Sequence, residues 1–228
     1  MTDQALPGLP QLDAIEARIL GALMEKQLTT PDAYPLTLNN LVLACNQKTS
    51  REPVSHYQPG EIEHSLRLLE QRKLVDVEWG SRADRYQQRL SRVLGVDKKV
   101  QALLNVMLLR GPQTVHELFT RCQRMHDFAD DAEIAGLLEL LCDKTTPVIC
   151  RLPRQSGQRE ERYMHLLSGE PDVSQWTQPA GRPAARPLAT ALEERLAQLE
   201  QAVADQAGQI GQLQEQLAIL AGMTGRQD

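Results

Sequence analysis

The hydrophobic and polar positions of this 228-residue chain follow one plan twice. In each copy, three segments place apolar residues three or four positions apart, the spacing of one helix face. Two short strand-like runs with a polar turn between them follow, as in a β-hairpin. Each hairpin is closed by an Arg-Tyr pair, Arg85-Tyr86 and Arg162-Tyr163. Three helices and a hairpin in a unit of about 75 residues predict a winged helix-turn-helix in each copy.

The first copy carries clear start signals for its helices. Asp13 can cap the first helix, and Pro59 with Glu61 marks the first turn of the third. Two prolines interrupt the helical spacing over residues 29–35, which predicts a loop that we expect Tyr34 to pin to the body. The pattern predicts helices over residues 12–26 and 36–45 and from Pro59, and strands over residues 74–79 and 85–89.

The second copy shows the same order with sharper boundaries. Gly111 and Pro112 end its first helix. Thr114 and Glu117 form a capping box for the second helix, and Asp130 and Glu133 predict the same device for the third. The pattern predicts helices over residues 98–109, from Thr114 to about Arg124 and after Asp130, strands over residues 148–152 and 161–166, and a wing over residues 153–160.

Apolar residues return on a strict heptad spacing after a proline-rich segment. With Ala189 as position a, nine of ten a and d positions are apolar, and Gln206 is the exception. Such a run predicts a coiled coil, here of two parallel strands, and therefore a homodimer. A helix that folds back onto its own domains is the alternative. The seam comprises Leu192, Leu196, Leu199, Val203, Gln206, Ile210, Leu213, Leu217 and Leu220.

These patterns predict a mainly α protein with small β-hairpins, of the α+β class. Tandem winged helix-turn-helix domains are followed by a C-terminal coiled-coil helix. The expected divisions are an N-terminal tail over residues 1–11, winged domains over 12–92 and 93–168, a proline-rich linker over 169–188 and a coil over 189–222.

Charge is distributed unevenly along the chain. The net charge is −5, and aromatic residues are only 4% of the total, so the cores must be aliphatic. Residues 1–92 carry 11 basic and 12 acidic side chains, residues 93–168 carry 10 of each, and residues 169–228 carry 4 and 8. The winged domains therefore lack the general basic field that drives non-specific nucleic-acid binding, and a DNA contact requires a local patch.

The lack of a long apolar stretch and the N-terminal sequence predict a soluble, cytoplasmic protein. No stretch approaches the length of an apolar membrane span, and the first residues do not resemble a secretion signal. The cysteines lack the paired spacing of a zinc site, so we expect buried free thiols and no metal or other cofactor. They are Cys45, Cys122, Cys142 and Cys150.

Several long strings resemble one bacterial family. They are residues 16–21 (EARILG), 25–36 (EKQLTTPDAYPL), 44–54 (ACNQKTSREPV), 110–114 (RGPQT) and 157–163 (GQREERY). They are similar to the YceH-like family of uncharacterised proteins over about residues 12–168. The resemblance implies tandem winged-helix domains and no established activity.

The third helix of the first copy is the leading candidate for a DNA contact. With Ile62, Leu66 and Leu69 buried, its outward face presents three residues that can donate hydrogen bonds to bases or phosphates. They are His64, Arg67 and Gln71. The alternative is a solvated surface, because Arg67 is spaced to pair with Glu63 and Glu70 along its own helix.

Further DNA-contact candidates lie in the wings and in a polar connection. In the wings they are Arg82 and Arg85, with Arg154 and Arg159 in the second copy. In the connection they are Lys48 and Arg51, whereas Asn46, Thr49 and Ser50 are expected to cap helix ends and turns locally.

The second third helix differs from the first. With Ile134, Leu138 and Leu141 buried, its outward positions are Gly136, Glu139 and Asp143. Two carboxylates would repel a polyphosphate, so this helix is expected not to read DNA. Glu139 and Asp143 are instead candidates for the interface with a basic protein partner.

Enzyme chemistry finds little support in the sequence. There is no glycine-rich phosphate loop, nucleophile elbow or zinc-protease signature, and His126 and His165 lack a nucleophile partner. We therefore expect a non-enzymatic protein. The leading hypothesis is a regulatory homodimer that binds double-stranded DNA through its first domain, and the alternative is a protein-interaction adaptor.

Overall fold

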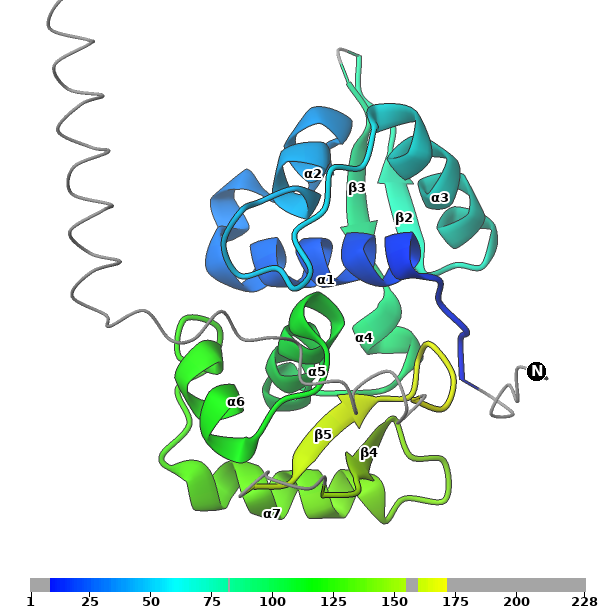
Figure 1. The fold of residues 1–228 in the computed structure, drawn as a ribbon. Coiled ribbons are helices and arrows are strands. Elements are labelled where there is room, and N and C mark those ends of the chain that lie inside the picture. The colour runs from blue at the N-terminus through cyan, green and yellow to red at the C-terminus, as the bar shows by residue number, and fades with distance from the viewer. Residues whose placement is uncertain (1–8, 82, 155–159, 172–228) are drawn as a thin grey trace, which may run out of the picture. The chain divides into compact units, whose positions relative to one another are not determined.

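The computed structural model describes residues 9–81, 83–154 and 160–171 of the chain, which form two copies of one arrangement (Figure 1). Each copy has three helices followed by an antiparallel hairpin. The first copy, called repeat 1, comprises α1 (Ala14–Thr29), the short 3-10 helix η1 (Pro31–Ala33), β1 (Leu36–Thr37), α2 (Leu38–Cys45), α3 (Pro59–Gln71), β2 (Val75–Glu78) and β3 (Arg85–Gln88).

The second copy, repeat 2, follows a one-turn helix, α4 (Leu90–Val93), which the sequence pattern did not predict. It comprises α5 (Lys98–Arg110), α6 (Val115–Cys122), α7 (Asp131–Cys142), β4 (Ile149–Leu152) and β5 (Arg162–His165). The structure confirms an α+β fold with small hairpins. The proline-rich linker and the heptad segment, residues 189–222, lie outside the described residues.

Most predicted helix starts are confirmed by their caps. The Asp13 side chain accepts a hydrogen bond from the Glu16 amide, and the Glu16 carboxylate accepts one from the Asp13 amide. Thr114 and Glu117 form the same reciprocal box. Asp130 also caps α7, but the Glu133 carboxylate accepts from the Ala129 amide, so that box does not close.

Several predicted boundaries differ from the observed ones by one to three residues. Helix α1 continues to Thr29, three residues beyond the predicted end. The helix predicted from residue 36 begins at Leu38, because Leu36 and Thr37 pair with β3 as a short strand and the Thr37 side chain caps α2.

The repeated Arg-Tyr pair fastens each hairpin to the segment before the second helix. Tyr86 lies opposite Leu36 in repeat 1, and Tyr163 lies opposite Gln113 in repeat 2. The preceding arginines act alike: Arg85 donates to the carbonyl of Pro35 at 2.9 Å and Arg162 to that of Pro112 at 3.0 Å. The pair therefore has the same structural role in both repeats.

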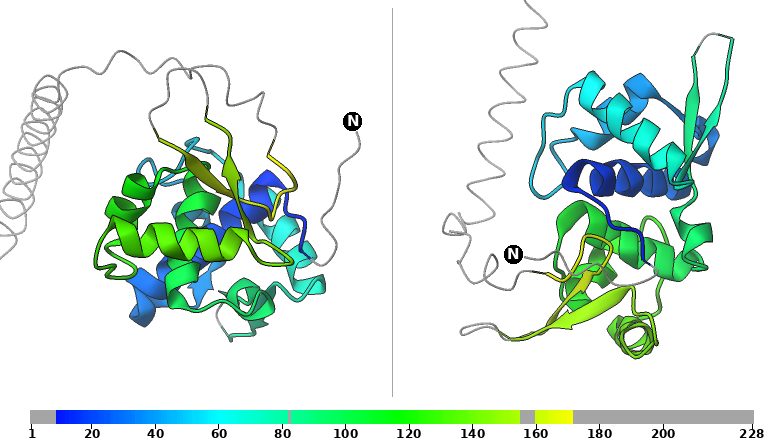
Figure 2. Two further views of the ribbon diagram at one scale, coloured as in Figure 1. Left: turned by 90° about the horizontal axis from the view of Figure 1, so that it is seen from below. Right: turned by 90° about the vertical axis from the view of Figure 1, so that its right-hand side faces the viewer.

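The two repeats pack through their first helices, α1 and α5, which lie side by side in two views (Figures 1 and 2). The cores of both repeats join in one aliphatic cluster. At the contact, Asn105, which is buried, donates its side-chain amide to the carbonyl of Gly21 at 2.5 Å. At one end of the interface, the Leu12 amide donates to the Leu167 carbonyl at 2.7 Å.

Candidate interaction surfaces

Helix α3 turns its apolar stripe inward as predicted. Ile62, Leu66 and Leu69 are at most 2% exposed, because they pack into the core of repeat 1. The opposite side presents His64, Arg67 and Gln71 to solvent. The structure therefore brings the three predicted DNA-contact residues onto one exposed face.

The charge of that face is not continuous. An Arg67 guanidinium nitrogen lies 2.7 Å from a Glu63 carboxylate oxygen, so the arginine is already paired along its own helix. Glu61 and Glu70 are also exposed on α3. The alternative of a solvated, ion-paired helix face thus describes α3 better than a positive strip does.

The described residues of the first hairpin contribute little free positive charge. Arg82 lies outside the described residues, and Arg85 donates to the Pro35 carbonyl. The most exposed apolar side chain of the hairpin is Trp79, 78% exposed just after β2. The sequence pattern placed Trp79 at the end of a strand and gave no signal for its exposure.

One predicted phosphate contact is wrong. The side chain of Arg51 is fully buried and pairs with Glu25 of α1 at 2.6 Å. It also donates to the Ala44 carbonyl at 3.0 Å and to the Gln47 side chain at 2.9 Å. Arg51 holds the α2–α3 connection, residues 46–58, against α1 and is not available to DNA.

A second buried arginine braces the same connection. Arg18 of α1 is 4% exposed and donates to the carbonyls of Cys45, at 3.1 Å, and Pro53, at 2.7 Å. Burial lowers the pKa of Arg18, and the neighbouring Arg51 lowers it further. Two guanidinium groups thus satisfy carbonyls that no helix or strand would satisfy.

The other polar residues of this region include one cap with an additional role. Asn46 is the C-cap of α2, as expected. Its side chain also reaches along the connection, where it donates to the Tyr57 carbonyl and accepts from the Tyr57 amide, at 2.8 and 2.9 Å. Ser50 adopts a positive φ of 60°. Lys48 is exposed, so it is the basic residue of the connection that remains accessible.

Tyr34 pins the preceding loop as expected. Its ring packs against the core, and its hydroxyl accepts a hydrogen bond from the Gln88 amide at 2.7 Å. Burial raises the pKa of the Tyr34 phenol to about 12, so it stays neutral.

Helix α7 has the outward face that the sequence predicted, with one addition. Ile134, Leu138 and Leu141 are at most 2% exposed, whereas Gly136, Glu139 and Asp143 face solvent. Leu140 is 69% exposed beside them, although the pattern analysis did not single it out. The result is a mixed acidic and apolar surface, here called the α7 face and comprising Gly136, Glu139, Leu140 and Asp143.

Charge on the α7 face is only weakly compensated. Helix α7 contains three acidic and no basic residues, and Asp130 and Asp143 lie at its ends. Glu139 lies 3.8 Å from Arg151 of β4, a long contact between exposed side chains. Asp143 forms no ion pair with any residue that the structure describes. This face fits a positively charged protein segment better than a polyphosphate.

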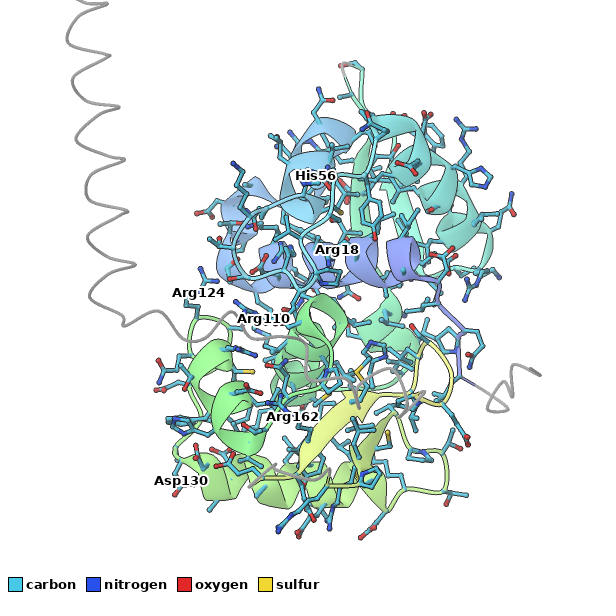
Figure 3. The ribbon with its side chains drawn as sticks, in the orientation of Figure 1. Arg18, His56, Arg110, Arg124, Asp130 and Arg162 are labelled. Carbon is cyan, nitrogen blue, oxygen red and sulfur yellow. The ribbon has the colours of Figure 1, made fainter. Side chains whose placement is uncertain are left out.

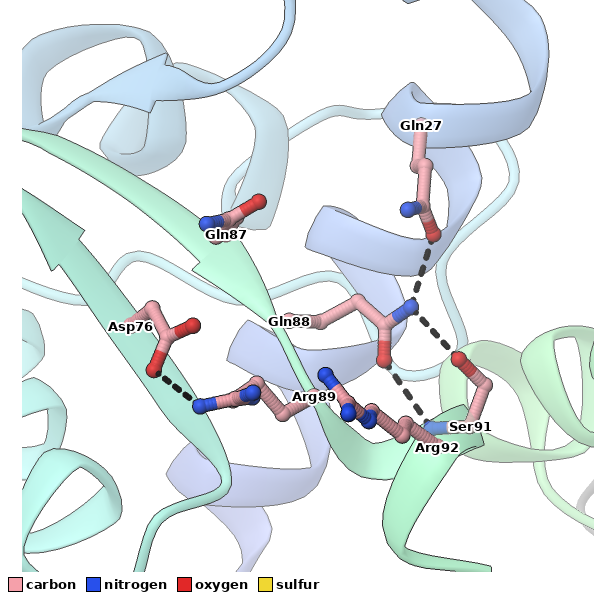
Figure 4. Close-up of a pocket in the computed structure, with 7 residues that line it drawn as sticks. All are labelled: Gln27, Asp76, Gln87, Gln88, Arg89, Ser91 and Arg92. Carbon is pink, nitrogen blue, oxygen red and sulfur yellow. Dashed lines mark hydrogen bonds and ion pairs between the residues drawn. The ribbon is translucent and has the colours of Figure 1, made fainter. Parts of the chain in front are cut away.

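A polar cavity of about 390 Å³ lies at the base of the first hairpin (Figure 4). Gln88 is the central residue: its amide nitrogen donates to Gln27 and Ser91, and its amide oxygen accepts from the Ser91 backbone. Arg89 pairs with Asp76 at 3.0 Å on the same wall. These side chains satisfy one another, so the cavity offers no free nucleophile or acid–base pair.

The cysteines and histidines do not assemble a reactive site. Cys45 and Cys122 are buried free thiols, and burial raises the pKa of each to about 12. Cys142 and Cys150 are half-buried, which is more open than expected. His165 is 3% exposed, and burial lowers its pKa to about 4.

Two kinds of site are absent from the described residues. In residues 9–81, 83–154 and 160–171, no three His, Cys, Asp or Glu side chains gather in a metal-binding arrangement. None of the helices in that part of the chain combines the length and hydrophobicity of a membrane span.

Comparison with known proteins shows one family. The pattern of the family described as "Protein of unknown function, DUF480" matches residues 12–158. A UPF0502 protein of Cellvibrio japonicus is 57% identical over 211 residues, which cover 92% of this chain and 97% of the relative. A UPF0502 protein of Stenotrophomonas maltophilia is 48% identical over 229 residues, covering 97% and 100%. A UPF0502 protein of Pseudomonas aeruginosa is 54% identical over 162 residues, covering 71% and 72%.

The matched region contains repeat 1 and repeat 2 as far as β4, including the two buried arginines, the capping boxes and the α7 face. The relatives from Cellvibrio japonicus and Stenotrophomonas maltophilia share about half of their residues with this chain over more than 90% of its length, which is more than a similar fold alone requires. The chain therefore belongs to the DUF480 family of bacterial proteins, whose members named above carry the name UPF0502.

Proposed function

We propose that each repeat is a winged helix and that the protein is a non-enzymatic interaction adaptor. The observation that carries this proposal is the α7 face, where exposed Leu140 lies between Glu139 and Asp143. In winged helices the third helix is the one commonly offered to a partner. Here it offers carboxylates and an apolar side chain, a combination suited to a protein.

The partner is a protein segment with basic and apolar side chains. Its lysines or arginines would meet Glu139 and Asp143, and its apolar residue would cover Leu140. Gly136 leaves open space, since a Cβ built there has nothing within 4 Å. A bulky partner side chain can therefore lie close to the helix backbone at that position.

A charge-reversal experiment tests the adaptor function. The full-length chain is used as bait, and a stoichiometric protein partner is expected. Glu139→Lys together with Asp143→Lys should abolish capture, because like charges then oppose each other at the interface.

The matched control reverses two exposed acidic side chains of α3, Glu63→Lys with Glu70→Lys, and should leave capture of that partner unchanged. If the partner is still captured after charge reversal at Glu139 and Asp143, the α7 face is not the interface. Equal loss of capture in both double variants would also contradict an α7 interface. Capture of nucleic acid strengthened by the α3 variant would point to the second candidate below.

DNA binding by repeat 1 is the second candidate function. The specific observation in its favour is that His64, Arg67 and Gln71 share an exposed face of the third helix. The ion pair between Arg67 and Glu63 weakens this candidate function, because Arg67 must break that ion pair to contact a phosphate. The other candidate contacts are Arg82, Arg85 and Lys48. Arg51 is not among them, because its side chain is buried.

A binding assay with random duplex DNA at low salt tests this candidate. Glu63→Gln should strengthen binding by freeing Arg67, and Arg67→Glu with Arg82→Glu should weaken it at least about tenfold, the loss of roughly one strong contact. If the duplex is not retained by the intact chain, or if neither variant changes retention, DNA binding by α3 is excluded.

We also propose that the chain is a homodimer joined by a coiled coil over residues 189–222. The support is the heptad spacing, with apolar residues at nine of ten seam positions. A dimer would present two α7 faces, which raises the effective affinity for a partner that carries two binding segments.

A further inference from the structure

Basic side chains gather where the two repeats meet. Three of them contact one carboxylate, that of Glu25 near the end of α1: Arg51 at 2.6 Å, Lys26 at 3.6 Å and Arg124 at 3.7 Å. In the view of Figure 3, Arg124 and Arg110 both lie between α1 and repeat 2. The group, here called the junction cluster, comprises Lys26, Arg51, Arg110, Arg121 and Arg124.

Backbone contacts fix Arg110 in this cluster. It is the last residue of α5, and the preceding carbonyl, that of Leu109, accepts from the Glu52 amide at 2.8 Å. Gln113 donates to the Arg110 carbonyl at 3.4 Å and accepts from the guanidinium of Arg121. Arg110 and Arg121 are thus neighbours on the two sides of Gln113.

The guanidinium of Arg110 lacks a partner among the described residues. It is half-buried, yet no carboxylate there lies within 4.0 Å of it and no described acceptor hydrogen-bonds to it. Burial lowers the pKa of Arg110, and the charges of Arg121 and Arg51 lower it further. The helix dipole at the C-terminus of α5 stabilises one nearby positive charge. It does not account for all the basic side chains of the junction cluster.

Nearby acids do not balance these charges. Glu25 is shared by three cations, and Glu117 is shared by Arg162, at 2.7 Å, and Arg121, at 4.0 Å. Glu52 raises the pKa of Arg110 but is not within ion-pair distance of it. The Arg110 guanidinium is not among the buried nitrogen atoms that lack a partner, so solvent or a ligand can reach it. An anion that supplies oxygen atoms there would form charge-assisted hydrogen bonds.

We propose that the junction cluster is a binding site for the phosphate group of a small phosphorylated molecule. The proposed ligands are the guanidinium groups of Arg110, Arg121 and Arg124, which come from two different segments. A phosphate group has more oxygen atoms than a carboxylate, so it can accept hydrogen bonds from several guanidinium groups at once. Side-chain exposure falls from 71% at Arg124 to 28% at Arg121 and 21% at Lys26. A small ligand reaches these inner groups, whereas a duplex backbone contacts only Arg124.

Inorganic phosphate is the first probe, titrated into the full-length chain by calorimetry at constant ionic strength with chloride as the balancing anion. Saturable binding is expected, together with a rise in unfolding temperature that chloride does not produce. Arg110→Gln and Arg124→Gln should each weaken binding at least tenfold. Because Arg124 is exposed, its variant keeps the test valid if Arg110→Gln unfolds the chain.

Arg154→Gln is the matched control, since it removes one exposed arginine of the second hairpin, and it should bind phosphate as the parent does. Adenosine triphosphate as a second probe distinguishes the source: tighter binding than inorganic phosphate assigns a nucleotide, and equal binding assigns the phosphate group alone. Phosphate that does not saturate, or that binds Arg110→Gln and the parent alike, overturns the proposal. Duplex DNA binding that depends on Arg110 without phosphate binding overturns it as well.

Discussion

Gly21 and Asn105 occupy the same position, the eighth residue, of the first helix in their respective repeats, and they contact each other. The side-chain amide of Asn105 donates to the Gly21 carbonyl at 2.5 Å. The two repeats therefore carry different residues at this contact. A side chain in place of Gly21 would collide with Leu109 and crowd Leu108.

Gly21→Ala is expected to destabilise the protein by about 1–3 kcal/mol, the usual cost of overpacking. An added Cβ would lie 2.8 Å from Leu109 Cδ2 and 3.2 Å from Leu108 Cβ. Gly136→Ala on α7 is the control, because open space surrounds it and alanine favours a helix by about 1 kcal/mol. Urea unfolding should therefore show opposite signs for the two variants, and equal effects would contradict the close contact at Gly21.

Arg51→Ala is expected to cost about 3–5 kcal/mol, because it leaves the buried Glu25 carboxylate without its 2.6 Å partner. Arg67→Ala removes an ion pair of similar length, 2.7 Å, but between exposed side chains, and should cost no more than about 1 kcal/mol. Equilibrium unfolding of the two variants measures the difference. Equal losses would show that burial of Arg51 is not the source of its effect.

Stability should fall between pH 6.5 and pH 4 because of His165. Burial lowers its pKa from 6.5 to about 4, so the unfolded chain binds a proton that the folded chain rejects in this window. The stability that neutral His165 contributes is fully present above pH 6.5 and is lost as the pH falls towards 4. From pH 7 to pH 5 the loss is about 2 kcal/mol, at 1.36 kcal/mol for each unit.

The variant His165→Gln should flatten this pH dependence whatever its own stability. Free energies of unfolding at pH 7 and pH 5 give the slope. A slope that is unchanged in the variant would assign the titration to another group.

Removal of the heptad segment should separate the proposed dimer. Sedimentation of the full-length chain is expected to give a dimer, and sedimentation of a chain that ends at Pro187 a monomer. A persistent dimer of the shortened chain would place the contact in the repeats, and a monomeric full-length chain would favour a helix that folds back.

Local signals predicted the helices well, because their ends are specified by neighbouring residues. Asp13, Thr114 and Gly111 each act within four positions of their partners, so the sequence alone suffices. Helix α4 escaped prediction because four residues carry no periodicity. Strand β1 escaped because its pairing with β3 depends on residues about 50 positions away.

The roles of the arginines could not be predicted either, because their partners lie far away in the sequence. Arg51 lies in a polar stretch that resembles an exposed loop, and its partner Glu25 is 26 positions earlier. Arg85 was assigned to a wing, although the repetition of Arg-Tyr was itself the signal that both copies share a structural contact. The outward faces of α3 and α7 followed from helical spacing, whereas the exposure of Leu140 became visible only with the packing.

The pairing of Gly21 with Asn105 also distinguishes the contact between the two repeats from a contact between two copies of one repeat. The first helix of repeat 1 contacts that of repeat 2 through two different residues, so an exchange of repeats between chains would keep this hydrogen bond only where α1 packs against α5. An α1 helix packed against a second α1 would lack the side-chain amide that donates to the Gly21 carbonyl. The unlike pair therefore favours a mixed contact of repeat 1 with repeat 2.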